Sequence, residues 1–351
     1  MSEKRFVDYA RHGGCSMKLA PGRLKALLGS LDGFSDGRRG WPDADISKVG
    51  AQQVASSVDV VLPMIDDPAQ FGRIVVNHVL SDLYAVGAEP IFALSILGIP
   101  KSPDDEADED AFNRAIDAEV ELMLLAADEE LRAAGATSAG GHTLMDHALF
   151  FGMAATGGFP DGEPISNRTA EDGDVLVLTK PIGTSVATKL WKTKEESKDD
   201  FGDIVDALLR SNRQASLAMR ELSHCACTDV TGFGLCGHLH NMLRASEVSG
   251  VLRTDDVPVF ASVVGHPYSD TDTSTRLLTS NREFLRSHLP GLNDDDPRHL
   301  LLLDAQVSGG LLIAMPPGDV DLFQARMREH DEETWIVGEV TSGKPGEIAL
   351  V

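Results

Sequence analysis

The chain has 351 residues, of which 42% are hydrophobic and 25% charged, and its 55 acidic and 31 basic residues give a formal net charge of −24. This length predicts about two domains, and the negative charge disfavours nucleic acid and anionic membranes as partners. An acidic, lysine-poor surface suits concentrated salt, which screens its self-repulsion. Neither a signal peptide nor a bilayer-spanning apolar run is visible. We therefore expect a cytoplasmic protein from a halophilic cell.

The first half of the chain alternates between predicted strands and helices, after a flexible Gly-rich segment with one short helix near residues 21–31. Apolar periodicity predicts strands over 54–62, 90–97 and 148–157 and helices over 67–86 and 111–134, with an acidic loop at 102–110 and a glycine turn at 139–143. Strands that alternate with helices in this way indicate an α/β layer.

The second half begins after a Pro- and Gly-containing linker at residues 160–164. We predict strands over 175–179, 335–340 and 348–351, short apolar segments at 301–304 and 308–315, and helices over 184–191, 201–224, 234–245 and 319–329. The expected organisation is a flexible N-terminal segment over 1–50, an N-terminal domain over 51–160 and a C-terminal α/β domain over 161–351.

The most reactive stretch of the N-terminal segment is Gly14-Cys15-Ser16-Met17-Lys18. A cationic neighbour favours the thiolate form of a cysteine, and a lysine can place a point charge on a phosphate. Cys15 and Lys18 are therefore candidate catalytic residues, although a free cysteine in a mobile tail has the same pattern.

Four aspartates next to glycines or near the ends of predicted elements are candidate metal ligands: Asp43, Asp59, Asp82 and Asp229. Scattered carboxylates of this kind can hold Mg²⁺ together with water and substrate phosphates. In a chain with 55 acidic residues, each of them could also be ordinary surface.

Three glycine clusters could bind phosphate through backbone amides: Gly140-Gly141-His142, Gly232-Phe233-Gly234 and Ser308-Gly309-Gly310. The sequence contains neither a P-loop motif nor a dinucleotide-binding fingerprint. A nucleotide that binds here would therefore use another kind of site, and tight turns alone remain the alternative.

Cys225, Cys227 and Cys236 lie close in sequence to His238 and His240, which makes this the most metal-like cluster of the chain. The spacing is not one of the usual zinc patterns. Buried structural cysteines near the start of a helix are the favoured interpretation, and a zinc site is the alternative.

Taken together, these blocks resemble the selenophosphate synthetases (selenide, water dikinases) over nearly the whole chain. The resemblance lies in Gly14-Cys15-Ser16-Met17-Lys18, Ala139-Gly140-Gly141-His142, and the blocks at 66–73, 80–87, 180–183, 228–235 and 304–311. The glycine-histidine block at 139–142 and the Thr-Asp-Val-Thr-Gly-Phe-Gly block at 228–234 also resemble the wider superfamily of aminoimidazole ribonucleotide synthetase, thiamine-monophosphate kinase and the hydrogenase-maturation ATPase. Only Cys15 and Lys18 point to the selenium branch. The resemblance implies a two-domain aminoimidazole ribonucleotide synthetase-like fold, with a helix-covered mixed sheet in each domain.

The resemblance also implies a reaction and a set of roles. The family converts ATP, selenide and water into selenophosphate, AMP and phosphate, and its members are homodimers that build the ATP site from the N-terminal domain and its partner. Cys15 is similar to the reactive cysteine or selenocysteine position, and Lys18 to the lysine that contacts the nucleotide phosphates. The remaining matches are Mg²⁺ ligands at Asp43, Asp82 and Asp229, ATP contacts at Asp59 and Asp82, and an ATP-binding loop at Gly140, Gly141 and His142.

The chain departs from the family pattern at several positions. The usual Cys-x-Cys-Lys is Cys15-Ser16-Met17-Lys18, which excludes a two-thiol mechanism in this loop. Asp43 and Asp45 are both present, so either could be the metal ligand. His78 stands where relatives often carry a small or amide residue.

Two other functions remain as alternatives. One is a superfamily kinase or synthetase for another small substrate, similar to thiamine-monophosphate kinase. The other is a non-catalytic ATP- or metal-binding protein with zinc at Cys225, Cys227 and Cys236.

Overall fold

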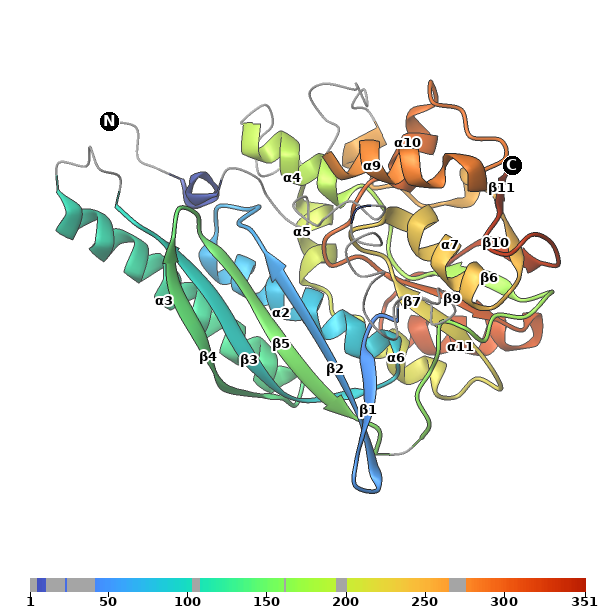
Figure 1. Ribbon diagram of the computed structural model, residues 1–351, viewed down its shortest axis with the longest axis horizontal. Coiled ribbons are helices and arrows are strands. Elements are labelled where there is room, and N and C mark those ends of the chain that lie inside the picture. The colour runs from blue at the N-terminus through green and yellow to red at the C-terminus, as the bar shows by residue number, and fades with distance from the viewer. Residues whose placement is uncertain are drawn as a thin grey trace.

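The computed structural model describes residues 5–10, 23, 42–102, 108–160, 162–193, 201–264 and 276–351. Its strands form a five-stranded sheet in the N-terminal half and a six-stranded sheet in the C-terminal half, with helices packed on both (Figure 1). The mixed α/β fold class is confirmed. The short helix expected near residues 21–31 lies outside the described residues, apart from Arg23.

The N-terminal sheet has the strand order β1-β2-β5-β3-β4. Its strands are β1 (Asp45–Val49), β2 (Gln52–Val61), β5 (Phe150–Gly158), β3 (Glu89–Pro100) and β4 (Thr137–Asp146). The helices α2 (Pro68–Ala85) and α3 (Glu109–Ala133) lie behind the sheet in Figure 1. The other face, here called the open face, carries the exposed side chains of Val58, Leu94 and Leu144. Val58 and Leu94 are both paired with Ala154 of β5, so they flank it across the sheet.

The helix α2 is the central element of the N-terminal half. Asp67 caps it by accepting a 3.0 Å hydrogen bond from the Gln70 amide, and Pro68 follows at the first helical position. Every residue from Ile74 to Ala85 is buried. A helix that is buried on all sides belongs in the interior of a protein, between other layers.

The C-terminal sheet has the strand order β11-β8-β10-β6-β9-β7. Its strands are β11 (Ile348–Leu350), β8 (Ser249–Leu252), β10 (Trp335–Thr341), β6 (Val175–Leu178), β9 (Leu311–Met315) and β7 (Ala226–Asp229). The helices of this half are α4 (Thr184–Thr193), α5 (Gly202–Leu209), α6 (Arg213–Met219), α7 (Gly234–Ala245), α8 (Ala261–Val264), α9 (Arg276–Leu285), α10 (Pro297–Leu303) and α11 (Val320–Arg328). The helix α7 contacts α9 and α10, and α6 contacts α11.

Two sequence expectations are wrong. The single helix predicted over 201–224 is interrupted between α5 and α6, where the Asn212 side chain donates to Ser81 Oγ at 2.9 Å and to the Gly309 carbonyl at 2.8 Å. The glycine turn predicted over 139–143 lies inside β4. There the register against β3 shifts between Ala93 and Ser95, which makes the glycines part of a β-bulge.

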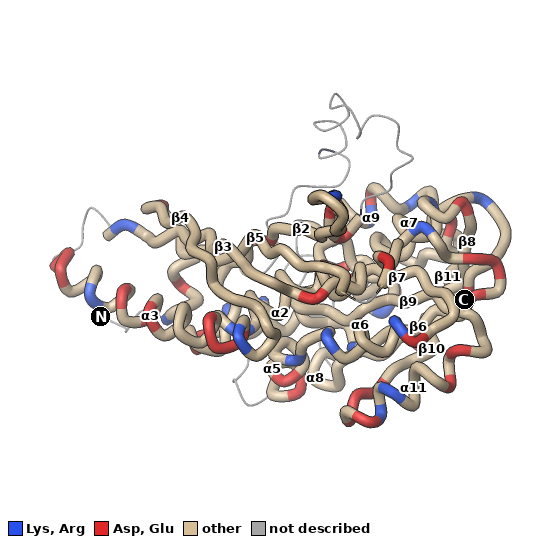
Figure 2. Tube along the Cα trace, turned by 90° about the horizontal axis from the view of Figure 1, so that it is seen from below, with Lys and Arg blue, Asp and Glu red and all other residues tan. Residues whose placement is uncertain are grey.

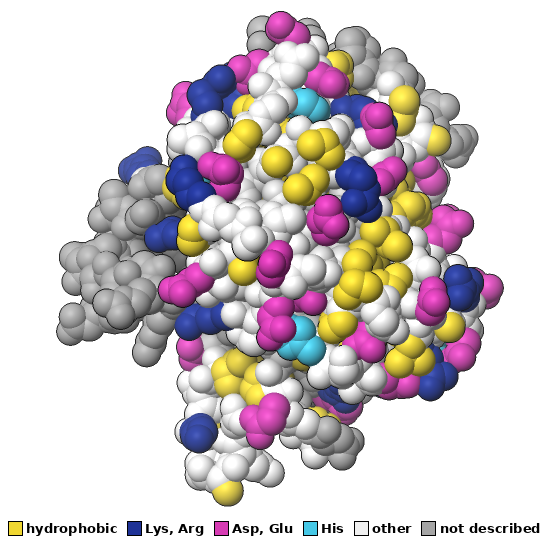
Figure 3. All heavy atoms as spheres, turned by 90° about the vertical axis from the view of Figure 1, so that its right-hand side faces the viewer, with side chains coloured by type: hydrophobic (Ala, Val, Ile, Leu, Met, Phe, Trp, Pro, Cys, Tyr) yellow, Lys and Arg dark blue, Asp and Glu magenta, His cyan; other side chains and the backbone are white. Residues whose placement is uncertain are grey.

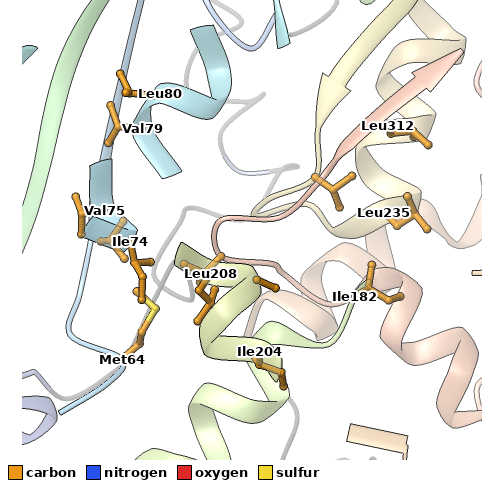
Figure 4. Close-up of a cluster of buried hydrophobic side chains, with 14 of the residues drawn as sticks. Met64, Ile74, Val75, Val79, Leu80, Ile182, Ile204, Leu208, Leu235 and Leu312 are labelled. Atoms are coloured by element: carbon orange, nitrogen blue, oxygen red, sulfur yellow. The ribbon is translucent and has the colours of Figure 1, made fainter. Parts of the chain in front are cut away.

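The two halves share one hydrophobic core. Figure 4 shows Met64, Ile74 and Val75 of the N-terminal half near Ile204 and Leu208 of α5. The same cluster of buried side chains continues to Leu235 and Leu312 of the C-terminal half. Each half therefore buries part of its apolar surface against the other.

The surface reflects the acidic composition. Asp and Glu residues, coloured red, recur along α3 and around α11 in the tube view (Figure 2). At the C-terminal end of the molecule, acidic and basic side chains surround apolar patches (Figure 3). Among the described helices, none combines the length and the apolar character needed to cross a bilayer.

Candidate active site

Two carboxylates and an imidazole from distant parts of the chain meet where its two halves touch. One possible ligand atom from each of Asp43, Asp229 and His238 lies within 4.8 Å of the other two. Asp43 precedes β1, Asp229 ends β7 and His238 lies in α7. Two carboxylates held this close repel each other unless a cation lies near both, and carboxylate oxygens are the donors that Mg²⁺ prefers. The residues present therefore fit a magnesium ion.

The structure distinguishes Asp43 from Asp45. Thr228 Oγ1 donates a 2.8 Å hydrogen bond to Asp43 Oδ1, which holds this carboxylate against β7. Asp45 is exposed at the start of β1 and accepts a hydrogen bond from Ser47 Oγ at 2.9 Å. It is thus Asp43 that lies beside Asp229.

The turn after β7 surrounds the His238 ring. The backbone amides of Thr231 and Phe233 point at His238 Nε2 from 3.1 and 3.4 Å. Gly234 then starts α7 with a φ of +69°, and a Cβ at this position would lie 2.7 Å from the Leu303 backbone. Only glycine fits such a position, which explains why the turn needs a glycine before the helix.

A second polar group lies between β2 and α2. Ser57 Oγ donates to Asp82, and His78 Nε2 lies 3.5 Å from Asp59 Oδ2. Ser57 and Asp59 lie two residues apart on one face of β2, and His78 and Asp82 lie four residues apart on one face of α2. The Ser57–Asp82 and Asp59–His78 contacts are therefore neighbours between the strand and the helix. Asp82 lies outside the compact group of Asp43, Asp229 and His238.

The loop of residues 308–310 connects these two groups. The Ser308 amide donates to His78 Nδ1 at 3.1 Å, and the Gly310 carbonyl accepts from the Val230 amide at 2.9 Å, one residue after Asp229. Ser308 has a φ of +45°, which is rare for a residue with a side chain. The third predicted glycine cluster is therefore a connection between α2 and the end of β7.

Gly309→Ala is expected to destabilise the protein. A Cβ on Gly309 would lie 2.0 Å from the Val230 carbonyl oxygen, so the backbone beside Asp229 would have to move. Overpacking of this kind costs roughly 1–3 kcal/mol. Thermal unfolding should show a lower midpoint for this variant and little change for Gly318→Ala, where a Cβ meets no atom within 4 Å. Equal midpoints for the two variants would contradict the prediction.

Lys180 lies beneath the same loop and is 2% exposed. Its ammonium group donates to the Ser308 carbonyl at 2.9 Å and to the Arg210 carbonyl at 2.6 Å. Burial, helped by the nearby Arg210 charge, lowers the pKa of Lys180 to about 7. Its charge state therefore changes near neutral pH.

Lys180→Met is expected to change the pH dependence of stability. Between pH 7 and the ordinary lysine pKa of about 10.4, the unfolded chain holds a proton that the folded chain has released, so folding becomes more favourable as pH rises. The Tm of the natural chain, measured relative to that of Lys180→Met, should increase from pH 6.5 to pH 9. Lys344→Met, at an exposed lysine, should keep the slope of the natural chain. Parallel curves for the natural chain and Lys180→Met would contradict the prediction.

Gly140, Gly141 and His142 lie apart from the other candidates within one chain. They belong to β4, at the opposite edge of the sheet from β1. His142 is paired with Ile96, and Ile96 lies two residues from the exposed Leu94, so His142 is on the open face, whereas Asp59 faces α2. β2 and β4 are three strand spacings apart, or roughly 14 Å.

Cys15 and Lys18 lie outside the described residues. The segment just before them is bound to both halves of the chain: Arg5 forms a 2.6 Å ion pair with Asp66, and Lys192 donates to the carbonyls of Val7 and Ala10. Residues 5–10 therefore have a defined place near α4, a few residues before Cys15.

The cysteine-rich cluster does not form one metal site in the structure. Cys227 and Cys236 are buried, and burial raises the pKa of Cys225 and Cys236 to about 12. The metal-like group among the described residues takes His238 from this stretch but no cysteine. Sequence spacing grouped His238 with the cysteines, and its nearness to Asp43 could not be read from the chain.

Comparisons with known proteins match both halves of the chain. Residues 42–159 match the family model "AIR synthase related protein, N-terminal domain", and residues 171–351 match "AIR synthase related protein, C-terminal domain". The chain is 30% identical over 353 residues to a selenide, water dikinase of Desulfitobacterium hafniense (strain Y51), covering 99% of each. It is 32% identical over 361 residues to a selenide, water dikinase of Nitratidesulfovibrio vulgaris (strain DSM 19637 / Miyazaki F), covering 100% of this chain and 99% of that protein.

Solved structures of low sequence identity share the fold. Thiamine monophosphate kinase from Aquifex aeolicus is 15% identical and superposes with a TM-score of 0.66, covering 94% of this chain and 96% of that one. Hydrogenase maturation protein HypE in complex with ATP is 19% identical with a TM-score of 0.58, covering 99% and 94%. Identities this low support a common fold alone.

Proposed function

Because this chain belongs to the selenide, water dikinase family, we propose that its cluster of Asp43, Asp229 and His238 marks the place where ATP-dependent synthesis of selenophosphate occurs. In the proposed reaction the enzyme uses ATP, selenide and water and releases selenophosphate, AMP and phosphate. The name of the relatives, selenide, water dikinase, supports selenide and water as acceptors. The observation that carries the location is the meeting of Asp43 with the end of β7, 185 positions away in the sequence. This contact lies between the proposed N-terminal segment, residues 1–50, and the proposed C-terminal domain, residues 161–351.

Magnesium is the metal that this site would hold. Asp43 and Asp229 would be direct ligands. Asp82, which accepts a hydrogen bond from Ser57 in the second polar group between β2 and α2, would contribute its charge from there. A bound Mg²⁺ would neutralise phosphate charge and orient the triphosphate, which is the usual role of the metal in phosphoryl transfer. Held in this way, a triphosphate does not require a P-loop.

Cys15 and Lys18 would complete the site, with Lys18 toward the nucleotide and Cys15 toward the selenium acceptor. We assign Lys18 to the nucleotide phosphates, where a cation stabilises charge that develops during transfer. We assign Cys15 to the capture or delivery of selenium, not to carrying the phosphoryl group. Selenide is already a strong nucleophile, so positioning it and excluding water are the main tasks of this segment.

A second copy of the chain would supply the missing part of the ATP site. Asp59 and His142 lie on opposite faces of the sheet, so they do not share a pocket in one chain. The open face carries exposed apolar side chains at Val58 and Leu94, and Leu94 lies on β3, the neighbour of the strand with His142. A homodimer formed through this face would cover them and place the partner's glycine bulge against the sheet that carries Asp59 on its other face.

Leu94→Arg is expected to break this dimer. Leu94 is 40% exposed in the middle of the open face, and a buried arginine without a partner there would destabilise the interface. Light scattering after size exclusion should give a monomer for this variant, with strongly reduced activity. Leu125→Arg is the matched control, because Leu125 is an exposed leucine on α3 that should stay outside the interface. A dimeric Leu94→Arg variant would contradict the assignment of this face.

The charge of the chain supports a salty cytoplasm as its environment. A net charge of −24 on 351 residues produces strong self-repulsion, which concentrated salt would screen. We therefore propose a cytoplasmic enzyme of a halophilic cell, and neither nucleic acid nor membranes are proposed as partners.

The test of the function is an ATP assay with and without selenide, followed by ³¹P NMR. Selenide-dependent formation of AMP, phosphate and selenophosphate is the expected result. Selenide-independent formation of ADP would instead support a kinase similar to thiamine-monophosphate kinase. Absence of ATP consumption under both conditions would support a binding protein.

A further inference from the structure

The proton positions around His238 follow from its neighbours. His238 Nε2 faces two backbone N–H donors, Thr231 at 3.1 Å and Phe233 at 3.4 Å. Because a ring nitrogen that accepts hydrogen bonds carries no proton, the neutral imidazole has its proton on Nδ1. Nδ1 lies 3.3 Å from Thr228 Oγ1 and therefore donates to this hydroxyl.

The direction of the next hydrogen bond is also determined. An ionised carboxylate only accepts hydrogen bonds, so the Thr228 hydroxyl donates to Asp43 Oδ1 across the 2.8 Å between them. The Thr228 hydroxyl thus accepts one hydrogen bond from His238 and donates another to Asp43. All three side chains are buried or half-buried, where such chains of hydrogen bonds hold their members firmly.

We propose that His238 is a positioning residue for the metal site: acting through the Thr228 hydroxyl, it fixes the orientation of the Asp43 carboxylate. This inference depends on the proposed role of Asp43 as a magnesium ligand. Outer-shell partners of metal ligands commonly set the orientation of the ligand in this way. The arrangement would make α7 of the C-terminal half responsible for aiming a carboxylate that belongs to the N-terminal half.

The arrangement argues against His238 as a direct ligand. Nε2 is occupied by backbone donors and Nδ1 carries a proton, so neither nitrogen offers a lone pair to a metal without rearrangement. Mg²⁺ also prefers oxygen over imidazole nitrogen. Direct ligation by His238 is the alternative that the experiment must separate from positioning.

The test is binding of Mn²⁺, used as a paramagnetic probe of the magnesium site, to the full-length chain by EPR titration. Thr228→Val removes the hydroxyl while keeping the shape of the side chain, and it should weaken Mn²⁺ binding about 10-fold. Thr228→Ser keeps the hydroxyl and should restore the affinity of the natural chain. His238→Leu should weaken binding to the same extent as Thr228→Val, and combining the two changes should add little.

His240→Leu controls for the loss of a buried histidine from α7. His240 is 1% exposed and pairs with the Gly346 carbonyl at 2.7 Å, so its replacement should leave Mn²⁺ affinity unchanged. Weak binding in His238→Leu with normal binding in Thr228→Val would indicate direct ligation and overturn the proposal. Asp43→Asn tests the proposed metal site separately from the proposed role of His238. If this variant binds Mn²⁺ like the natural chain, the proposed metal site itself is wrong.

Discussion

Asp43→Asn is expected to reduce selenide-dependent ATP consumption by roughly 100-fold or more, the scale expected when a charge-stabilising group is lost from a transfer site. The change keeps the size of the side chain and its hydrogen bond from Thr228, but it removes the negative charge beside Asp229. Activity should be measured as AMP release at saturating ATP, and Mn²⁺ affinity should fall in parallel. Because the fold is not strained by this change, the thermal midpoint should change little.

Asp45→Asn is the matched control for this experiment. Asp45 is exposed and its described partner is Ser47, so its loss should leave both activity and Mn²⁺ affinity close to those of the natural chain. The opposite pattern, with activity lost in Asp45→Asn and kept in Asp43→Asn, would transfer the ligand role to Asp45.

Cys15→Ser is expected to abolish selenophosphate formation while leaving ATP binding intact. A serine hydroxyl lacks the soft, polarisable sulfur that we assign to holding selenide near the nucleotide, but the proposed phosphate contacts at Lys18 and Mg²⁺ do not involve the sulfur. Product should be followed by ³¹P NMR, and nucleotide binding by calorimetry with the non-hydrolysable analogue AMPPCP.

Cys225→Ser tests whether the effect belongs to Cys15 and not to any cysteine. Burial raises the pKa of Cys225 to about 12, so this thiol is protonated at neutral pH and should not contribute to chemistry. Full activity is expected for this variant. Loss of nucleotide binding in Cys15→Ser would contradict the proposed division of roles.

Regular elements with strong periodicity were predictable from the sequence. The helix expected over 67–86 is α2, because Asp67 and Pro68 are local start signals and the apolar spacing is helical. The interruption after Leu209 was not predictable, because it depends on hydrogen bonds from Asn212 to Ser81 and Gly309. The glycines of β4 were misinterpreted because a bulge and a turn use the same residue type.

The candidate site was predictable as a set of residue types but not as an arrangement. Asp43 and Asp229 could be proposed from the resemblance, and the structure brings them together. The position of His238 beside them depends on the turn that starts α7, while the cysteines next to it in sequence suggested a different metal site. The separation of His142 from Asp59 depends on strand order, which local sequence patterns do not encode.

The burial of α2 also bears on how the protein could be divided. Because Ile74 and Val75 lie in one core with Leu208, a fragment that ends near residue 160 would expose to water an apolar surface that the intact chain covers. A cut in the linker at residues 160–164 would therefore leave two fragments that stay associated, like the two chains of a nicked protein. The two regions that match separate family models therefore depend on each other in folding.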